Sequence, residues 1–117
     1  MILRTEGNTK KVDEHILVCL SAAPSNKKII DTATKMAHAL QARFTALYVQ
    51  TGTKAEAMDK ERLEEHIRYA EKLGAEIVMT HGENIPVQIA EYARLSNVTK
   101  IVIGQNNARR NHFFSRM

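Results

Sequence analysis

The sequence predicts an α/β fold with a small, doubly wound parallel sheet. Two short apolar runs rich in β-branched residues, residues 15–20 and Lys100–Gly104, have the composition of strands that are buried on both faces. Between these runs, strand-forming and helix-forming segments alternate along the chain. Strands that alternate with helices over four units imply right-handed crossovers and helices on both faces of a parallel sheet.

The first half of the chain predicts two strands and two helices. After the first apolar run, Ser25 is the expected N-cap of a helix in which apolar residues recur at helical spacing: Ile29, Ile30, Ala33, Met36, Ala37 and Leu40. Arg43–Gln50 is rich in β-formers and predicts the second strand. A long helix is expected over residues 55–73, with Gly74 as its C-cap and a narrow inward face of Leu63, Ile67, Ala70 and Leu73.

The second half predicts two more strands and one more helix. Residues 75–80 are the third expected strand, and Ile85–Leu95 is the third helix, with Asn84 as its cap and Pro86 in its first turn. Lys100–Gly104 is the fourth strand. If the chain winds outward through three strands and then returns beside the first, the strand order is 3-2-1-4.

This order predicts a ligand crevice between the first and fourth strands. In open parallel sheets, ligands bind outside the carboxyl ends of the strands, where the winding direction reverses. Ser21 and Gly104 are the small residues at those two ends, and the loop after Gly104 adds Arg109 and Arg110. Paired guanidiniums suit a phosphate or another anion. A simple turn at the glycine and a solvated arginine pair are the alternative interpretations.

Composition and charge indicate one soluble domain and argue against several function classes. The 117 residues are 44% hydrophobic, contain one cysteine, and include no apolar stretch near the roughly 20 residues of a membrane span. We therefore expect a cytoplasmic domain at residues 14–117, preceded by a polar tail or linker remnant at residues 1–13. The net charge of +4 comes from cations scattered among carboxylates, with no aromatic platform beside them, which argues against nucleic acid binding.

No catalytic or metal-binding pattern accompanies the crevice. The five histidines share no close ligand spacing, and the single Cys19 offers no thiolate pair for zinc. The sequence contains neither a P-loop nor a G-x-S-x-G nucleophile elbow. The sequence therefore predicts a binding domain that has no catalytic activity and no metal.

Several segments together resemble the universal stress protein fold, which is adenine nucleotide alpha hydrolase-like. They are residues 16–20, 44–49, 73–76 and 98–104 and the Arg109-Arg110 pair. Over residues 14–115, the sequence is more closely similar to the universal-stress-protein-like domain in the cytoplasmic half of KdpD-type sensor histidine kinases. This resemblance implies a sensory domain in potassium or osmotic homeostasis, with the other domains of the parent kinase as partners and no direct membrane insertion.

The resemblance implies two nucleotide ligands, and the sequence departs from the pattern for each. ATP-binding members carry an acidic residue at the position of Ser21 and a glycine-rich segment in which Asn107 here replaces the second glycine. Because Mg²⁺ prefers carboxylate oxygens, ATP ranks second. Some KdpD-type domains bind cyclic di-AMP through Ser-x-Ser followed by Phe-Thr-Ala-x-Tyr. Ser21 and residues 44–48 match this pattern, whereas Ala23 replaces the second serine and Ser25 is the candidate substitute.

The family also has a fifth strand after the phosphate loop, and the few residues beyond 110 predict that this strand is missing or truncated. An uncovered strand edge favours pairing with another chain, so a homodimer is one expected partner. The predicted ligand-binding set is Ser21, Ala22, Ser25, Val49, Gly104, Asn107, Arg109 and Arg110. Val49 lines an adenine pocket by analogy to the family or is simply a core residue. The alternatives to a nucleotide-binding regulatory domain are a free-standing universal stress protein that binds ATP and a dimerisation module without a small ligand.

Overall fold

A computed structural model of the chain describes residues 13–52, 57–104 and 111–115. The first half of this part contains β2 (His15–Cys19), α1 (Asn26–Leu40), β3 (Arg43–Gln50) and α2 (Ala57–Lys72). The second half contains β4 (Glu76–His81), α3 (Ile85–Leu95), β5 (Lys100–Gly104) and β6 (Asn111–Ser115). The strands and helices alternate through β5, as the sequence predicts.

The described strands form one sheet of five, in the order β4-β3-β2-β5-β6. β2 pairs in parallel with both β3 and β5, and β3 pairs in parallel with β4. The order of the four parallel strands is therefore 3-2-1-4 in chain order, which confirms the prediction. The winding direction reverses between β2 and β5.

The fifth strand, which the sequence predicts to be missing or truncated, is present as the five-residue β6. β6 pairs antiparallel with β5, from Lys100↔Ser115 to Gly104↔Asn111, and covers the edge that the sequence analysis left open. Parallel neighbours need a crossover of a dozen or more residues, whereas an antiparallel neighbour needs only a short connection. Only residues 105–110 separate β5 from β6. This connection is too short for the crossover to a parallel strand and long enough to reach an antiparallel one.

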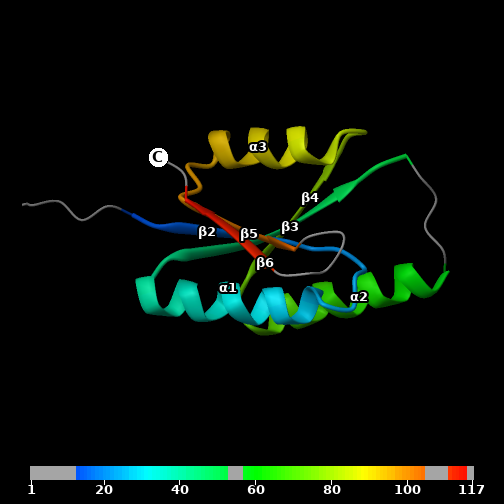
Figure 1. Cartoon of the computed structure of the whole chain (residues 1–117), viewed down its shortest axis with the longest axis horizontal. Coiled ribbons are helices and arrows are strands. Elements are labelled where there is room, and N and C mark those ends of the chain that lie inside the picture. The colour runs from blue at the N-terminus through cyan, green and yellow to red at the C-terminus, as the bar shows by residue number, and fades with distance from the viewer. Residues whose placement is uncertain (1–12, 53–56, 105–110, 116–117) are drawn as a thin grey trace, which may run out of the picture.

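Helices cover both faces of the sheet (Figure 1): α1 and α2 lie side by side on one face, and α3 lies on the other. Successive residues of a strand point to opposite faces, so β2 contributes to two cores. The core under α1 and α2 contains Ile16, Val18, Ile29, Ile30, Ala33, Ala46 and Val102. The core under α3 contains Leu17, Leu47, Val49, Ala93, Val98 and Ile101. Burial on both faces explains why the central strands read as continuous apolar runs.

The helix ends follow local sequence signals. The Asn84 side chain accepts a hydrogen bond from the Val87 amide at the start of α3, as an N-cap does. Gly74, two residues after α2, has a φ of +103°, a conformation that favours glycine. Ser25 precedes α1, but its side chain makes no capping bond. Within the part of the chain that the structure describes, every helix is too short or too polar to cross a membrane.

Candidate functional site

The structure brings the ends of β2 and β5 together at one edge of the sheet. These strands are parallel neighbours, with Ile16 opposite Lys100 and Val18 opposite Val102. Ser21 lies two residues beyond β2, and Gly104 is the last residue of β5. Because the winding direction reverses between these strands, this edge is where an open α/β sheet offers a ligand crevice.

A buried asparagine shapes the loop that follows β2. Asn26, the first residue of α1, is 1% exposed. Its Nδ2 donates to the Cys19 carbonyl at 3.0 Å, and its Oδ1 accepts from the Ser21 amide at 3.3 Å. Buried backbone groups need partners, and this one side chain supplies them on both sides of Leu20. The loop between β2 and α1 therefore has a defined shape.

Two side chains of α2 form hydrogen bonds with the backbone of the same loop. The His66 Nδ1 donates to the Ser21 carbonyl at 2.7 Å, which requires the hydrogen of the imidazole to be on Nδ1. The Arg62 Nη1 donates to the Ala22 carbonyl at 3.1 Å. His66 is 6% exposed. The backbone of residues 21–22 is thus fixed by groups from both helices on this face of the sheet.

The Ser21 side chain is exposed just beyond the end of β2. Its Oγ accepts a hydrogen bond from the Ala23 amide at 3.2 Å. A hydroxyl has one hydrogen to donate in addition to its acceptor lone pairs, so Ser21 keeps a donor for a ligand oxygen. Ser25 contributes its carbonyl to the first turn of α1, where it accepts from the Lys28 amide at 3.1 Å.

The backbone of β5 at Gly104 lies against Ile29 of α1. A Cβ atom at this position would lie 2.4 Å from Cδ1 of Ile29, which is shorter than real Cβ contacts. Ile29 is buried at the start of α1, with 2% exposure. Gly104 therefore has a packing reason for lacking a side chain, whether or not a ligand also approaches it.

Replacing Gly104 by alanine is expected to lower the free energy of unfolding by about 1–2 kcal/mol, because extra atoms in a filled site force neighbours to move. The variant Ile29→Val removes the Cδ1 methyl that the new Cβ would meet. In that background, we expect Gly104→Ala to cost less than about 0.5 kcal/mol, measured by urea denaturation of the single and double variants. Equal costs in both backgrounds would show that this contact does not explain the glycine.

The remaining predicted ligand residues are a core valine and three residues outside the described part of the chain. Val49 is 8% exposed and packs in the core under α3, beside Leu47 and Ile101, so its place in an adenine pocket stays a prediction. Asn107, Arg109 and Arg110 lie outside the described residues, and their phosphate contacts also stay predictions. Burial raises the pKa of Cys19, at the end of β2, to about 12, so this thiol is protonated at neutral pH.

Asn26, Arg62 and His66 hold the loop, and sequence reasoning missed all three. The helical spacing of the sequence nevertheless indicates that two of them, Asn26 and His66, face inward. Asn26 precedes Ile29 by three residues and Ile30 by four, and His66 precedes Ala70 by four, so each occupies the inward stripe of its helix. A polar residue on an otherwise apolar stripe requires a buried hydrogen-bond partner.

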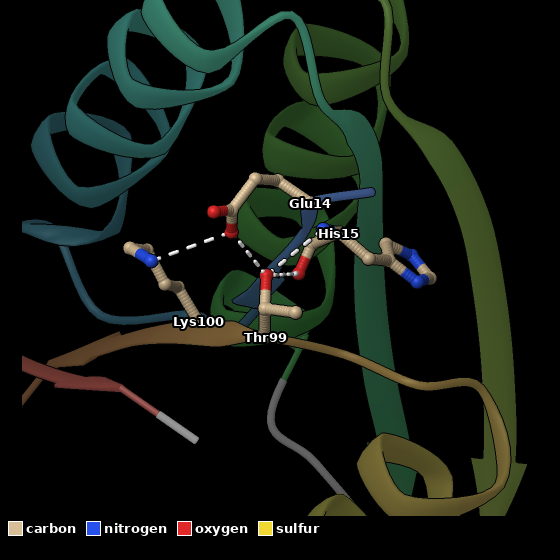
Figure 2. Close-up of polar contacts among 4 residues, drawn as sticks. All are labelled: Glu14, His15, Thr99 and Lys100. Atoms are coloured by element: carbon tan, nitrogen blue, oxygen red, sulfur yellow. Dashed lines mark hydrogen bonds and ion pairs between the residues drawn. The ribbon is translucent and has the colours of Figure 1, made fainter. Parts of the chain in front are cut away.

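The opposite edge of the sheet is held by a second polar cluster, at the amino ends of β2 and β5 (Figure 2). The Thr99 Oγ1 donates to Glu14 Oε1 at 2.7 Å and accepts from the His15 amide at 3.0 Å. Lys100 Nζ lies 3.3 Å from the same Glu14 oxygen. The hydrogen bond from Thr99, assisted by Lys100, lowers the pKa of Glu14 below its ordinary value. These contacts align β2 with β5 at the end remote from the crevice.

His15 joins three elements at this edge. Its Nδ1 donates to the Ser96 carbonyl, just after α3, at 3.0 Å, and its Nε2 lies 2.8 Å from the Thr45 hydroxyl of β3. Because Nδ1 carries the hydrogen, Thr45 donates to Nε2. His15 is 2% exposed, and burial lowers its pKa below the ordinary value. The contacts of His15 thus stabilise the scaffold.

Comparison with curated proteins identifies relatives of one kind. No family model matches the chain. The chain is 43% identical over 106 residues to the sensor protein KdpD of Clostridium acetobutylicum, a match that covers 88% of this chain and 12% of that protein. It is 29% identical over 97 residues to the sensor protein KdpD of Escherichia coli K12, which covers 81% of this chain and 11% of the relative. The chain thus spans a small part of the length of these relatives.

Solved structures with a similar fold are universal stress proteins. One from Burkholderia pseudomallei superposes with a TM-score of 0.64 at 18% identity, over 81% of this chain and 83% of the other. A universal stress protein in complex with cAMP gives 0.59 at 18% identity, over 83% and 80%. The protein from Archaeoglobus fulgidus in complex with dAMP gives 0.55 at 21% identity, over 80% and 82%. The chain is homologous to a segment of the KdpD sensor proteins, and this segment has the fold of the universal stress proteins.

Proposed function

We propose that the chain is a non-catalytic, cytoplasmic regulatory domain of a KdpD-type two-component sensor kinase, and that it binds a nucleotide across the ends of β2 and β5. Cyclic di-AMP is the ligand we favour, and ATP is the alternative. The observation that carries this proposal is the shaped loop after β2. Its backbone is held by Asn26, Arg62 and His66, while the Ser21 hydroxyl beside the end of β5 stays exposed.

A shaped loop favours binding because little conformational entropy remains to be lost when a ligand docks. A protein that uses three side chains to fix one exposed loop holds its hydroxyl and amide groups in position in advance. Two universal stress proteins of similar fold are in complex with adenine nucleotides, one with cAMP and the other with dAMP. These points support a nucleotide as the class of ligand.

The Phe-Thr-Ala-Leu-Tyr segment of β3 contributes to this proposal through one end only. Thr45 is buried and hydrogen-bonded to His15 near the amino edge of the sheet, so it serves the scaffold. Tyr48 lies three residues further toward the carboxyl end and packs, half-buried, against the core under α1 and α2. In the proposed site, Tyr48 is the member of the segment that is positioned near the crevice.

A nucleotide would regulate the parent kinase by shifting a conformational equilibrium. Binding that favours one arrangement of the domain by about 1–3 kcal/mol changes the populations of two signalling states about five- to 150-fold. The other domains of the kinase are the partners that would read this shift. A second copy of the domain is a further candidate partner.

The proposal predicts that Ser21→Ala binds cyclic di-AMP at least about tenfold more weakly than the unaltered chain, because a hydrogen bond to a charged group contributes about 1.5–3 kcal/mol. The measurement is isothermal titration calorimetry with cyclic di-AMP and, separately, with ATP. Ser96→Ala is the matched control. It removes one hydroxyl just after α3, at the other edge of the sheet, and should leave the affinity unchanged.

The outcomes separate the alternatives. Binding of cyclic di-AMP that weakens in Ser21→Ala alone supports the proposal. Binding of ATP alone, with the same dependence on Ser21, assigns the crevice to ATP and favours the free-standing universal stress protein. The absence of heat from both nucleotides would overturn nucleotide sensing and leave regulation through protein partners.

A further inference from the structure

A hollow lies between α1 and α2. Its volume is about 380 Å³, within the range of small-ligand sites, and it is lined by Lys27, Glu65, His66, Arg68, Tyr69 and Lys72. We call it the α1–α2 groove. Glu65, Arg68, Tyr69 and Lys72 follow the i, i+3, i+4, i+7 spacing, so they form one stripe of α2 that faces α1.

The charge of the α1–α2 groove is positive. Lys27, Arg68 and Lys72 are cationic, against the single carboxylate of Glu65. None of the three cations forms an ion pair with any residue that the structure describes. Exposed cations on helices commonly pair with carboxylates three or four residues away. Here three of them surround one hollow without doing so, which favours an anionic occupant.

Tyr69 lines the groove, and contacts with Lys27 and Asp31 of α1 hold its ring in place. The Lys27 Nζ stands 4.7 Å from the centroid of the Tyr69 ring, a cation–π contact. The Tyr69 hydroxyl donates to the Asp31 carboxylate of α1, and this bond raises the pKa of Tyr69. Asp31 is thus hydrogen-bonded to the tyrosine and is not among the residues that line the groove. These contacts join α1 to α2 and place the Lys27 ammonium over the Tyr69 ring.

One residue that lines the groove, His66, also contacts the loop after β2. His66 lines the groove, and its Nδ1 donates to the Ser21 carbonyl at 2.7 Å. A movement of this ring acts on the loop, because the ring is hydrogen-bonded to the Ser21 carbonyl and is 6% exposed. A ligand bound in the groove would therefore change the conformation of residues 21–22.

We propose that the α1–α2 groove is a binding site for a small phosphoryl anion and that His66 transmits its occupancy to the Ser21 loop. A phosphoryl group matches the site because it carries up to two negative charges and three acceptor oxygens, and an arginine fork binds two of those oxygens at once. The small volume fits a single phosphoryl group or a phosphomonoester. This site is distinct from the crevice between β2 and β5, and the inference does not depend on the nucleotide proposed there.

The test is a two-dimensional ¹⁵N–¹H NMR titration of the full chain with inorganic phosphate and, separately, with AMP, at matched ionic strength in sodium chloride. We expect saturable shifts of the amides of Lys27, Arg68 and Tyr69, accompanied by shifts at Ser21 and Ala22 that have the same midpoint and weaken with them in the groove variant. Shifts caused by direct binding at the crevice would not weaken in that variant. The double variant Arg68→Gln, Lys72→Gln should bind about tenfold more weakly, since each lost charge contact contributes up to about 1 kcal/mol. Lys60→Gln is the matched control, because it removes an exposed cation of α2 that does not line the groove.

The two anions distinguish the source of the phosphoryl group. Equal affinities identify the free anion as sufficient, and tighter binding of AMP shows that the nucleoside adds contacts. Both results support the site. Shifts that rise linearly without saturation, or that are the same in the double variant and in Lys60→Gln, would overturn it. Saturable shifts at the groove amides without any shift at Ser21 and Ala22 would overturn the transmission through His66. Ser21→Ala should leave phosphate binding intact, so failure at the crevice is distinguishable from failure at the groove.

Discussion

Replacing Asn26 by alanine is expected to lower the free energy of unfolding by about 3 kcal/mol. The substitution leaves the Cys19 carbonyl and the Ser21 amide without their partner, and each buried group that loses its hydrogen bond costs about 1–3 kcal/mol. Alanine is the better helix former by about 0.5 kcal/mol, which offsets only a small part of the loss. Denaturation in urea, with the midpoint and slope compared between variants, measures the change.

Asn84→Ala is the matched control for this prediction. Asn84 is exposed and caps α3 through one hydrogen bond to the Val87 amide, so its loss should cost about 1 kcal/mol. If Asn26→Ala costs no more than this control, the asparagine does not hold the loop. The same variant should weaken nucleotide binding at the crevice even where it remains folded, because the loop would lose its defined shape.

The second large effect is a dependence of stability on pH that originates at His15. Burial lowers the pKa of this histidine in the folded chain below the ordinary value of 6.5, while the hydrogen bond to the Ser96 carbonyl opposes that shift. The unfolded chain therefore binds the proton more readily than the folded chain does. The stabilisation is present above pH 6.5 and is lost as the pH falls through 6.5 toward the lower folded-state pKa.

His15→Gln tests this origin. At about pH 7.5, where the histidine is neutral, the variant should be less stable by about 2 kcal/mol, because glutamine cannot reproduce both hydrogen bonds of the buried ring. Between about pH 7.5 and pH 5.5, however, the variant should lose less stability than the unaltered chain. His38→Gln, at an exposed position of α1, should keep the full pH dependence. Parallel pH profiles for the unaltered chain and His15→Gln would contradict the assignment.

The parts of the fold that the sequence predicted well are those in which local pattern and tertiary packing agree. Arg43–Gln50 and Ile85–Leu95 match β3 and α3 at both ends, because β-forming composition defines the first and a cap with a proline in the first turn defines the start of the second. β4 begins one residue later than predicted and includes His81, which lies opposite Gln50. Strand ends of this kind depend on pairing with the neighbouring strand, which a single segment does not encode.

The fifth strand was missed for a different reason. The expectation rested on the few residues beyond the phosphate loop, whereas the five residues of β6 follow β5 closely and run antiparallel to it. For the site, the predicted strand order correctly placed the ends of β2 and β5 side by side. The groups that shape the loop come from α1 and α2, and only the three-dimensional packing shows that Arg62 reaches the Ala22 carbonyl.

The most direct test of the proposed nucleotide crevice is an NMR titration of the full chain with cyclic di-AMP. The account predicts that the largest amide shifts occur at Ser21, Ala22 and Gly104, at the carboxyl ends of β2 and β5, and that they saturate. The amides of His15 and Lys100, at the amino ends of the same strands, should shift least. Largest shifts at those amino ends, or no saturable shift anywhere, would contradict the proposal that these two strand ends form the sensing site.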